Sequence, residues 1–297
     1  VFLMNNLESF QNILNNSENS RHKEWNQYRI QITDCIIEKI KDKNINSTLI
    51  IGAGNSDDIN LKKIEKYTSY LNISDIDTSA LKASFEKYNL NNKKSKILSI
   101  DYIGLNESSL WNNFLNNFIN FSTKLEIKKF FHDINDIIAN YIFLKNNSYD
   151  LIIVSPIYTQ LFLNQGLAFI EILKQLNYPI HLIDYINIML METTRKVIKR
   201  FNQNLFNITK KNIIVISDIF EAKYDSDFYK KIFALDELDE ILVAYQTQYG
   251  IGLGDFGLED LESHMSLVSS KWFKWPFNKE KCMFVKLNEY KKVGCQG

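Results

Sequence analysis

The segment Thr48–Leu61 reads TLIIGAGNSDDINL and joins three structural signals in one short stretch. An apolar run ends in Gly52-Ala53-Gly54, and the polar residues that follow lead into a helical pattern. This order predicts a strand, a tight glycine turn and the N-terminus of a helix. Glycine lets the backbone bend sharply and approach a ligand closely, and a helix N-terminus presents free N–H groups. The segment therefore predicts a nucleotide-type binding turn.

Strand-like and helical patterns alternate on both sides of this turn. The strand-like runs with intervening helices are Thr48–Ile51, Ser69–Ser74, Lys96–Ile100, Leu151–Val154 and Asn212–Ser217. Trp272–Trp275 and Met283–Leu287 follow as a closing pair of strands. The alternation predicts an α/β fold, Rossmann-like and doubly wound, with a mostly parallel sheet and helices on both faces.

Three helical regions flank or interrupt this pattern. Residues 1–46 are expected to form an N-terminal helical segment, in which Ser20–Lys43 has the apolar spacing of one amphipathic helix. Residues 47–297 then form one α/β domain, with a helical insertion at about residues 106–148. The insertion either packs on the sheet or covers a pocket as a lid. The glycine-rich run Gly250–Gly257 is interpreted as a loop over the substrate pocket.

Ligands of parallel sheets bind beyond the carboxyl ends of the strands. Those ends carry Gly52–Asn55, Asp75, Asp101 and Ser155-Pro156. Asp75 lies 21 residues after Gly54, where a carboxylate can accept hydrogen bonds from a ribose diol. The alternative role for such a residue is a helix N-cap, which suits Asp77 better. Asp101 could likewise serve a turn.

The turn itself helps to choose the ligand. A dinucleotide site usually has the pattern G-x-G-x-x-G, and Asp57 stands in place of its third glycine. A carboxylate there would face the pyrophosphate of NAD, and this like-charge contact is unfavourable. S-adenosylmethionine (SAM) has no phosphate and carries a positive sulfonium. The acids at the turn therefore favour SAM.

Composition excludes several classes of function. The chain has 297 residues with 35 basic and 35 acidic side chains, so it has no general attraction to nucleic acid. Three widely spaced cysteines form no disulfide framework, which favours a cytoplasmic location. No apolar run approaches the roughly 20 residues of a membrane helix. The four histidines show no metal-ligand spacing, so no metal site is expected.

The chain resembles the class I SAM-dependent methyltransferases, in particular a poorly characterised bacterial branch, from about Thr48 to Leu287. TLIIGAGNSDDINL, LNISDIDTSAL, KILSIDYIGL and YDLIIVSPIYTQL resemble four successive family motifs. The first departs from the family at Ile50, where an acid is usual, and at Ser56, where glycine is usual. Asp57 or Asp58 could replace the missing contact to the amino group of the ligand. The resemblance implies a seven-stranded sheet whose last strand inserts antiparallel between its neighbours.

The resemblance also implies the residues that bind SAM. These are Gly52, Ala53, Gly54, Asn55, Asp58, Asp75, Ile76, Asp101, Tyr102, Ser155 and Pro156. Among them, Asp75 would take the ribose, and Asp101 with Tyr102 would meet the adenine.

The expected reaction is methyl transfer to N, O or C of a small-molecule acceptor. Ser155-Pro156-Ile157-Tyr158 is one substitution from the [DNS]-P-P-[YF] motif of amino-nitrogen methyltransferases, in which the aromatic ring stacks on the target group. Tyr158 and His181 are candidate catalytic residues, the latter as a general base if it reaches the pocket. Two other functions remain open: an NAD(P)-dependent oxidoreductase, and a non-catalytic module that binds SAM or a nucleotide.

Overall fold

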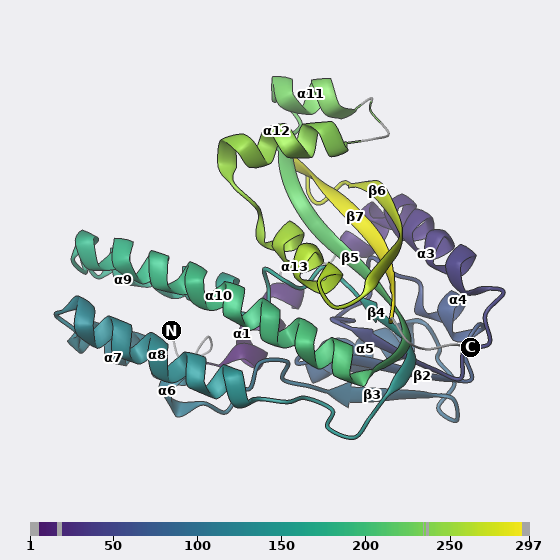
Figure 1. The fold of residues 1–297 in the computed structure, drawn as a ribbon, viewed down its shortest axis with the longest axis horizontal. Helices are drawn as coiled ribbons and strands as arrows, with labels where there is room; N and C mark the ends of the chain where they lie inside the picture. The colour runs from purple at the N-terminus through teal and green to yellow at the C-terminus, as the bar shows by residue number, and fades with distance from the viewer. Residues whose placement is uncertain (1–5, 17–19, 234, 236–237, 293–297) are drawn as a thin grey trace.

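A computed structural model describes residues 6–16, 20–233, 235 and 238–292. Within this part of the chain, one seven-stranded sheet has the order β3-β2-β1-β4-β5-β7-β6. The strands are β1 Ser47–Ile51, β2 Tyr70–Asp75, β3 Ser95–Ser99, β4 Tyr149–Val154, β5 Thr209–Lys223, β6 Ser266–Trp275 and β7 Lys281–Lys291. Strands β1 to β5 pair in parallel, and β7 pairs antiparallel with both β5 and β6. The predicted sheet and its inserted antiparallel strand are confirmed (Figure 1).

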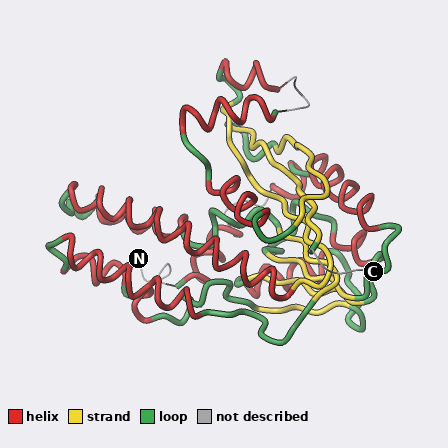
Figure 2. The backbone as a smooth tube through the Cα atoms, viewed as in Figure 1, coloured by secondary structure: helices red, strands yellow, loops and turns green. Residues whose placement is uncertain are grey.

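Buried side chains cover both faces of the sheet. Along β1, Leu49 and Ile51 belong to one apolar cluster and Ile50 to the other. Successive strand residues point to opposite faces, so a continuous apolar run can be buried on both sides. Helices α3, α4 and α5 contribute to the cluster on one face, while α8, α9, α10 and α13 contribute to the other. Figure 2 shows the strands enclosed between these helices.

Three helices precede β1 in the part of the chain that the structure describes. They are α1 Leu7–Asn16, α2 Arg21–Glu24 and α3 Asn26–Ile40. The single helix expected over Ser20–Lys43 is thus broken at Trp25 (φ −88°, ψ 10°). The indole N–H of Trp25 donates to the Phe277 carbonyl at 3.0 Å, and its ring packs on Trp275. This buried contact outweighs the continuous helical pattern of the sequence.

Two short helices connect the first three strands, α4 Leu61–Glu65 and α5 Thr78–Lys87. Asn60 caps α4, and the Asp77 carboxylate caps α5 by accepting from the backbone N–H groups of Ser79 and Ala80. Caps of this kind satisfy the free N–H groups at a helix start. Asp77 therefore has the capping role that its sequence position suggested.

The insertion forms part of a helical arm that projects from the sheet (Figure 1). It contains α6 Ser109–Asn112, α7 Phe114–Asn120 and α8 Lys124–Asn140, and it packs against α9 Leu163–Gln175 and α10 Ile180–Ile208. Stacked and edge-to-face aromatic rings hold these helices together, including the pair Phe114–Phe169 with centroids 4.9 Å apart. No residue of α6, α7 or α8 lines the pocket described below, so the insertion is not its lid.

The C-terminal region corrects one prediction. It contains α11 Asp227–Phe233, α12 Asp239–Tyr249 and α13 Leu253–Glu262, so most of the glycine run Gly250–Gly257 is helical. A Cβ on Gly254 would collide with the Asp218 carbonyl oxygen, and one on Gly257 would lie 2.5 Å from the Tyr158 ring. These glycines let α13 approach the sheet closely. They form no loop over the pocket.

Among the described residues, no helix is both long enough and apolar enough to cross a bilayer.

Candidate functional site

A cavity of about 250 Å³ lies at the carboxyl edge of the parallel strands. All eleven residues expected to bind the cofactor line it: Gly52, Ala53, Gly54, Asn55, Asp58, Asp75, Ile76, Asp101, Tyr102, Ser155 and Pro156. They come from the ends of β1, β2, β3 and β4. The strand order brings these ends together, because parallel strands end at the same edge of a sheet.

The glycine turn has the backbone conformation that its sequence predicts. Gly52 and Gly54 have φ values of +69° and +41°, in the left-handed region that favours glycine. Ser56 also has a positive φ, of +47°, and its hydroxyl donates to the Ala53 carbonyl at 2.8 Å. Ser56 therefore takes over the turn position at which the family usually has glycine, and a local hydrogen bond holds it there.

Asp75 faces the turn from the end of β2. One carboxylate oxygen accepts from the Gly54 N–H and the other from the Asp77 N–H, both at 3.0 Å. Burial raises the pKa of Asp75 to about 6, while these two N–H donors act in the opposite direction. The carboxylate is thus held at the pocket wall by the loops that follow β1 and β2.

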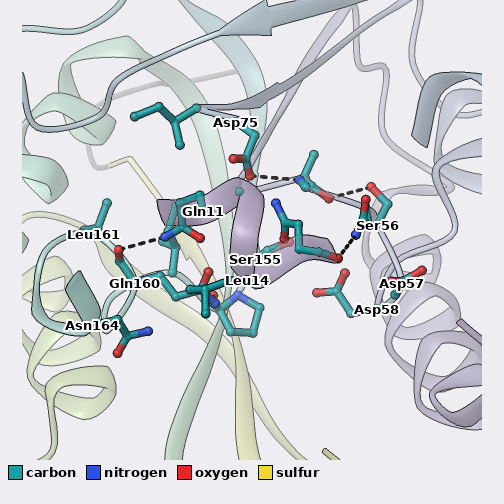
Figure 3. A pocket seen from close by; sticks show the side chains of 18 of the residues that line it. Gln11, Leu14, Ser56, Asp57, Asp58, Asp75, Ser155, Gln160, Leu161 and Asn164 are labelled. Carbon is teal, nitrogen blue, oxygen red and sulfur yellow. Dashed lines mark hydrogen bonds between the residues drawn. The ribbon is translucent and has the colours of Figure 1, made fainter. Parts of the chain in front are cut away.

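The two consecutive acids after the turn have different environments. Asp57 pairs with Lys87 at 2.8 Å and with His22 at 3.3 Å. The Asp58 carboxylate has no hydrogen bond or ion pair with another side chain in the described part of the chain, although it lines the pocket (Figure 3). Burial raises the pKa of Asp58 to about 6. Asp58 is therefore the acid that is available to a ligand.

Asp101 and Tyr102 shape the wall beyond β3. The Asp101 carboxylate accepts from the backbone N–H groups of Ile103, Gly104 and Asn106, at 2.7–2.9 Å. The Tyr102 hydroxyl accepts from the Gly52 N–H at 3.1 Å. Both residues thus support the loops around the pocket, and a contact with adenine stays a prediction.

Ser155 and Pro156 line the pocket at the end of β4, but Tyr158 does not. The Tyr158 ring is fully buried, and its hydroxyl donates to Asn202 Oδ1 on α10 at 3.0 Å. The expected stacking of this ring on an acceptor is therefore wrong. His181 is also wrong as a candidate base, because it is exposed in the first turn of α10 on the helical arm and does not line the pocket.

Helix α1 covers the pocket, which the sequence interpretation missed. Leu7, Gln11, Leu14 and Asn15 line the cavity from this side. Gln11 donates to the Gln160 carbonyl at 3.2 Å, and Asn15 donates to the Asp77 carboxylate at 2.9 Å. The spacing of Leu7, Phe10 and Leu14 is an amphipathic signal that could have revealed the helix, though not where it docks.

An aromatic wall forms a further part of the pocket. Trp25, Trp275 and Phe277 line it, with the centroids of Trp25 and Trp275 4.7 Å apart. Trp275 is only 5% exposed, yet it borders the cavity. Arg21, which donates to the Leu14 carbonyl, lies near this wall with its guanidinium 5.5 Å from the Trp25 ring centroid.

No known protein family and no curated protein matches the chain in sequence. Solved structures with a similar arrangement include the N-methyltransferase NodS from Bradyrhizobium japonicum in complex with S-adenosyl-L-homocysteine. It is 12% identical, with 89% of this chain and 87% of that chain covered and a TM-score of 0.45. The magnesium protoporphyrin IX methyltransferase from Synechocystis with bound SAM is 10% identical, with 93% and 85% covered and a TM-score of 0.44. The strand order β3-β2-β1-β4-β5-β7-β6, with β7 antiparallel, agrees with the arrangement that the resemblance to class I methyltransferases implies.

Proposed function

We propose that this chain binds SAM and transfers its methyl group to a small acceptor. The observation that carries the proposal is the charge of the pocket wall. Among the described residues that line it, the acidic and basic side chains are four carboxyl groups, Asp57, Asp58, Asp75 and Asp101, and one guanidinium, Arg21. Such a wall suits a cationic ligand and disfavours a pyrophosphate, which argues against NAD(P).

The residues present fit the groups of SAM. Asp75 would accept from the ribose hydroxyls, and the wall formed by Ile76, Asp101 and Tyr102 would border the adenine. The available carboxylate of Asp58 would take the ammonium group, and Arg21 would take the carboxylate of the same tail. This arrangement replaces the acid that the family usually carries at the position of Ile50.

SAM, when bound, supplies an electrophilic methyl group on a sulfonium. The chain orients the acceptor and excludes water. Both effects can lower the activation barrier of such a transfer substantially. Helix α1 excludes solvent from above the strand ends. Ser155 has a buried hydroxyl with no hydrogen-bond partner in the described structure, and it stands at the end of β4 where an acceptor would lie. Nitrogen as the target atom rests on the sequence pattern Ser155-Pro156, and the ring of Tyr158 does not take part.

Calorimetric titration tests the proposal. SAM and S-adenosylhomocysteine should bind, and NAD⁺ and NADP⁺ should bind far more weakly or not at all. Selective binding of either dinucleotide would instead establish the oxidoreductase alternative. Mass spectrometry of a small molecule that co-purifies with the protein provides an independent check.

If the protein binds SAM but methylates no acceptor, the alternative of a non-catalytic SAM-binding module would be favoured. The variant Asp34→Ala is a suitable control in these titrations, because Asp34 is exposed on α3 and pairs with Lys63.

A further inference from the structure

One side of the pocket carries no acidic or basic side chain among the described residues. Figure 3 shows Gln160 and Asn164 on one side of Ser155. Asp58 lies on the other side. The uncharged group, called the neutral compartment below, consists of Gln11, Gln160, Leu161 and Asn164.

The neutral compartment offers hydrogen bonds that the protein does not use. Gln11 donates to the Gln160 carbonyl, and Gln160 Nε2 donates to the Pro156 carbonyl at 2.9 Å, so the side-chain carbonyls of both glutamines remain available. The side-chain amide of Asn164 makes no hydrogen bond within the described chain, whereas its backbone N–H donates to the Thr159 carbonyl. The Ser155 hydroxyl at its boundary is also unpartnered, in a residue that is 4% exposed. Ser155 therefore marks the boundary of the compartment, and the side-chain amides supply its available hydrogen-bonding groups.

The composition of the compartment restricts the acceptor. An alcohol or phenol must lose its proton to become a good nucleophile, and none of the four residues can act as a base. An aliphatic amine has a pKa of about 10 and is protonated at neutral pH, so its lone pair is blocked. A carboxylate acceptor would need a cation, which the compartment lacks. A heteroaromatic ring nitrogen keeps a free lone pair, since imidazole has a pKa of about 6.5.

We propose that the acceptor is a small, uncharged nitrogen heterocycle, held by the amides of the neutral compartment with a ring nitrogen as nucleophile. This inference rests on the proposed methyl transfer. The nitrogen lone pair forms the new N–CH₃ bond, and the CH₃–S bond breaks with its electron pair passing to sulfur. The positive charge moves from the sulfonium to the heterocycle, and no proton is transferred in the step.

A panel of acceptors tests the inference with labelled SAM. Imidazole, nicotinamide and adenine are the probes, while catechol, benzoate and dimethyl sulfide represent acidic oxygen and neutral sulfur acceptors. We expect methylation of at least one heterocycle and of none of the other three compounds. Methylation of catechol, benzoate or dimethyl sulfide overturns the inference, and so does inactivity of all three heterocycles in a protein that binds SAM. Failure to bind SAM is a separate result, which overturns the proposed function as well.

Variants test whether the methylated heterocycle binds in the neutral compartment. Asn164→Leu and Gln11→Leu should each raise its KM about fivefold or more, because each removes a hydrogen-bonding amide, and should change the SAM Kd less than twofold. Gln175→Leu, an exposed position on the same helix as Asn164, is the matched control. An unchanged KM in both variants excludes the neutral compartment as the acceptor site. The SAM Kd verifies that each variant is folded.

Discussion

The two sides of the pocket differ in charge and in origin. The acidic side consists of the glycine turn after β1 with Asp57 and Asp58, next to Asp75 at the end of β2. The neutral compartment is built from α1 and from residues that follow β4. The acidic side thus comes from short motifs at strand ends, whereas the neutral compartment needs a helix from the start of the chain to dock on the finished sheet. We infer that the first side selects the cofactor and the second selects the acceptor.

This division can be tested, because substitutions on the acidic side should affect binding of the cofactor and substitutions in the neutral compartment should affect binding of the acceptor. Substitutions on the acidic side should lower the affinity for SAM. Whether they also lower the affinity for a fragment of SAM should depend on which groups that fragment keeps. Loss of the contact between Asn15 of α1 and Asp77 should alter how long the cofactor stays bound.

The largest effect is expected for Asp75→Ala. The substitution removes the proposed ribose contact and the acceptor of the Gly54 and Asp77 N–H groups. Hydrogen bonds to a charged group contribute about 1.5–3 kcal/mol, so SAM affinity should fall by about 10- to 100-fold. Calorimetry should show the same loss for 5′-methylthioadenosine, which keeps the ribose but lacks the amino-acid tail. Unchanged affinity for both ligands would show that Asp75 does not contact the cofactor.

A smaller and more selective effect is expected for Asp58→Asn. If Asp58 binds the ammonium group, SAM affinity should fall about tenfold, which corresponds to about 1.4 kcal/mol, and methylthioadenosine affinity should stay the same. Asp57→Asn is the matched control, since Asp57 is already paired with Lys87 and His22. In that variant, the affinities for SAM and for methylthioadenosine should change by the same factor. Equal losses of both ligands in Asp58→Asn would argue against the ammonium contact.

The affinity for SAM should also depend on pH. Burial raises the pKa of Asp58 to about 6, so the carboxyl is neutral below that pH and charged above it. A positive ammonium favours the charged form, and SAM should therefore bind more tightly as the pH rises from 5 to 7.5, by up to about tenfold. Asp75, whose pKa is also about 6, adds a similar dependence for every ligand with a ribose. The ratio of SAM to methylthioadenosine affinity isolates Asp58, and a ratio that does not vary with pH would contradict its role.

The smallest effect is expected for Asn15→Ala in α1. This side chain joins the helix to Asp77 at 2.9 Å, and its loss weakens the cover of the pocket by one charge-assisted hydrogen bond. The dissociation rate of S-adenosylhomocysteine should rise about fivefold, which corresponds to about 1 kcal/mol. Stopped-flow fluorescence of the tryptophans can measure it. Asn16→Ala is the control, since Asn16 Nδ2 bonds to Asn12 within the same helix. An equal rise of the dissociation rate in that variant would show that the helicity of α1, and not the contact with Asp77, controls the rate.

The strand ends were predictable because their signals are local. A glycine at positive φ, an apolar run buried on both faces and an acid after a strand each reflect the conformation of a few neighbouring residues. Gly52, Gly54 and Asp75 could therefore be assigned to one edge before their contacts were known. The division into an N-terminal segment of residues 1–46 and a domain of residues 47–297 stays a prediction.

Other assignments failed because they depend on partners distant in the chain. Tyr158 follows a polar strand end, but Asn202 and Gly257 draw its side chain into the core. The glycines of α13 suggested a loop, yet they serve the close approach of that helix to β5 and to Tyr158. Helix α1 has an amphipathic pattern, but such a pattern gives no docking position. Such contacts span long stretches of sequence, so no local pattern records them.

The sequence by itself thus determined the alternating α/β pattern, the glycine turn and the acids that favour a cationic ligand, since each follows from local conformation or charge. The tertiary structure decided which acid remains available, which aromatic ring is withdrawn and which helix covers the pocket. Those outcomes depend on competition among distant partners for hydrogen bonds and buried surface. Asp57 and Asp58 are adjacent in the chain, and the pairing of Asp57 with Lys87 and His22 leaves Asp58 as the unpaired carboxylate of the two at the pocket wall.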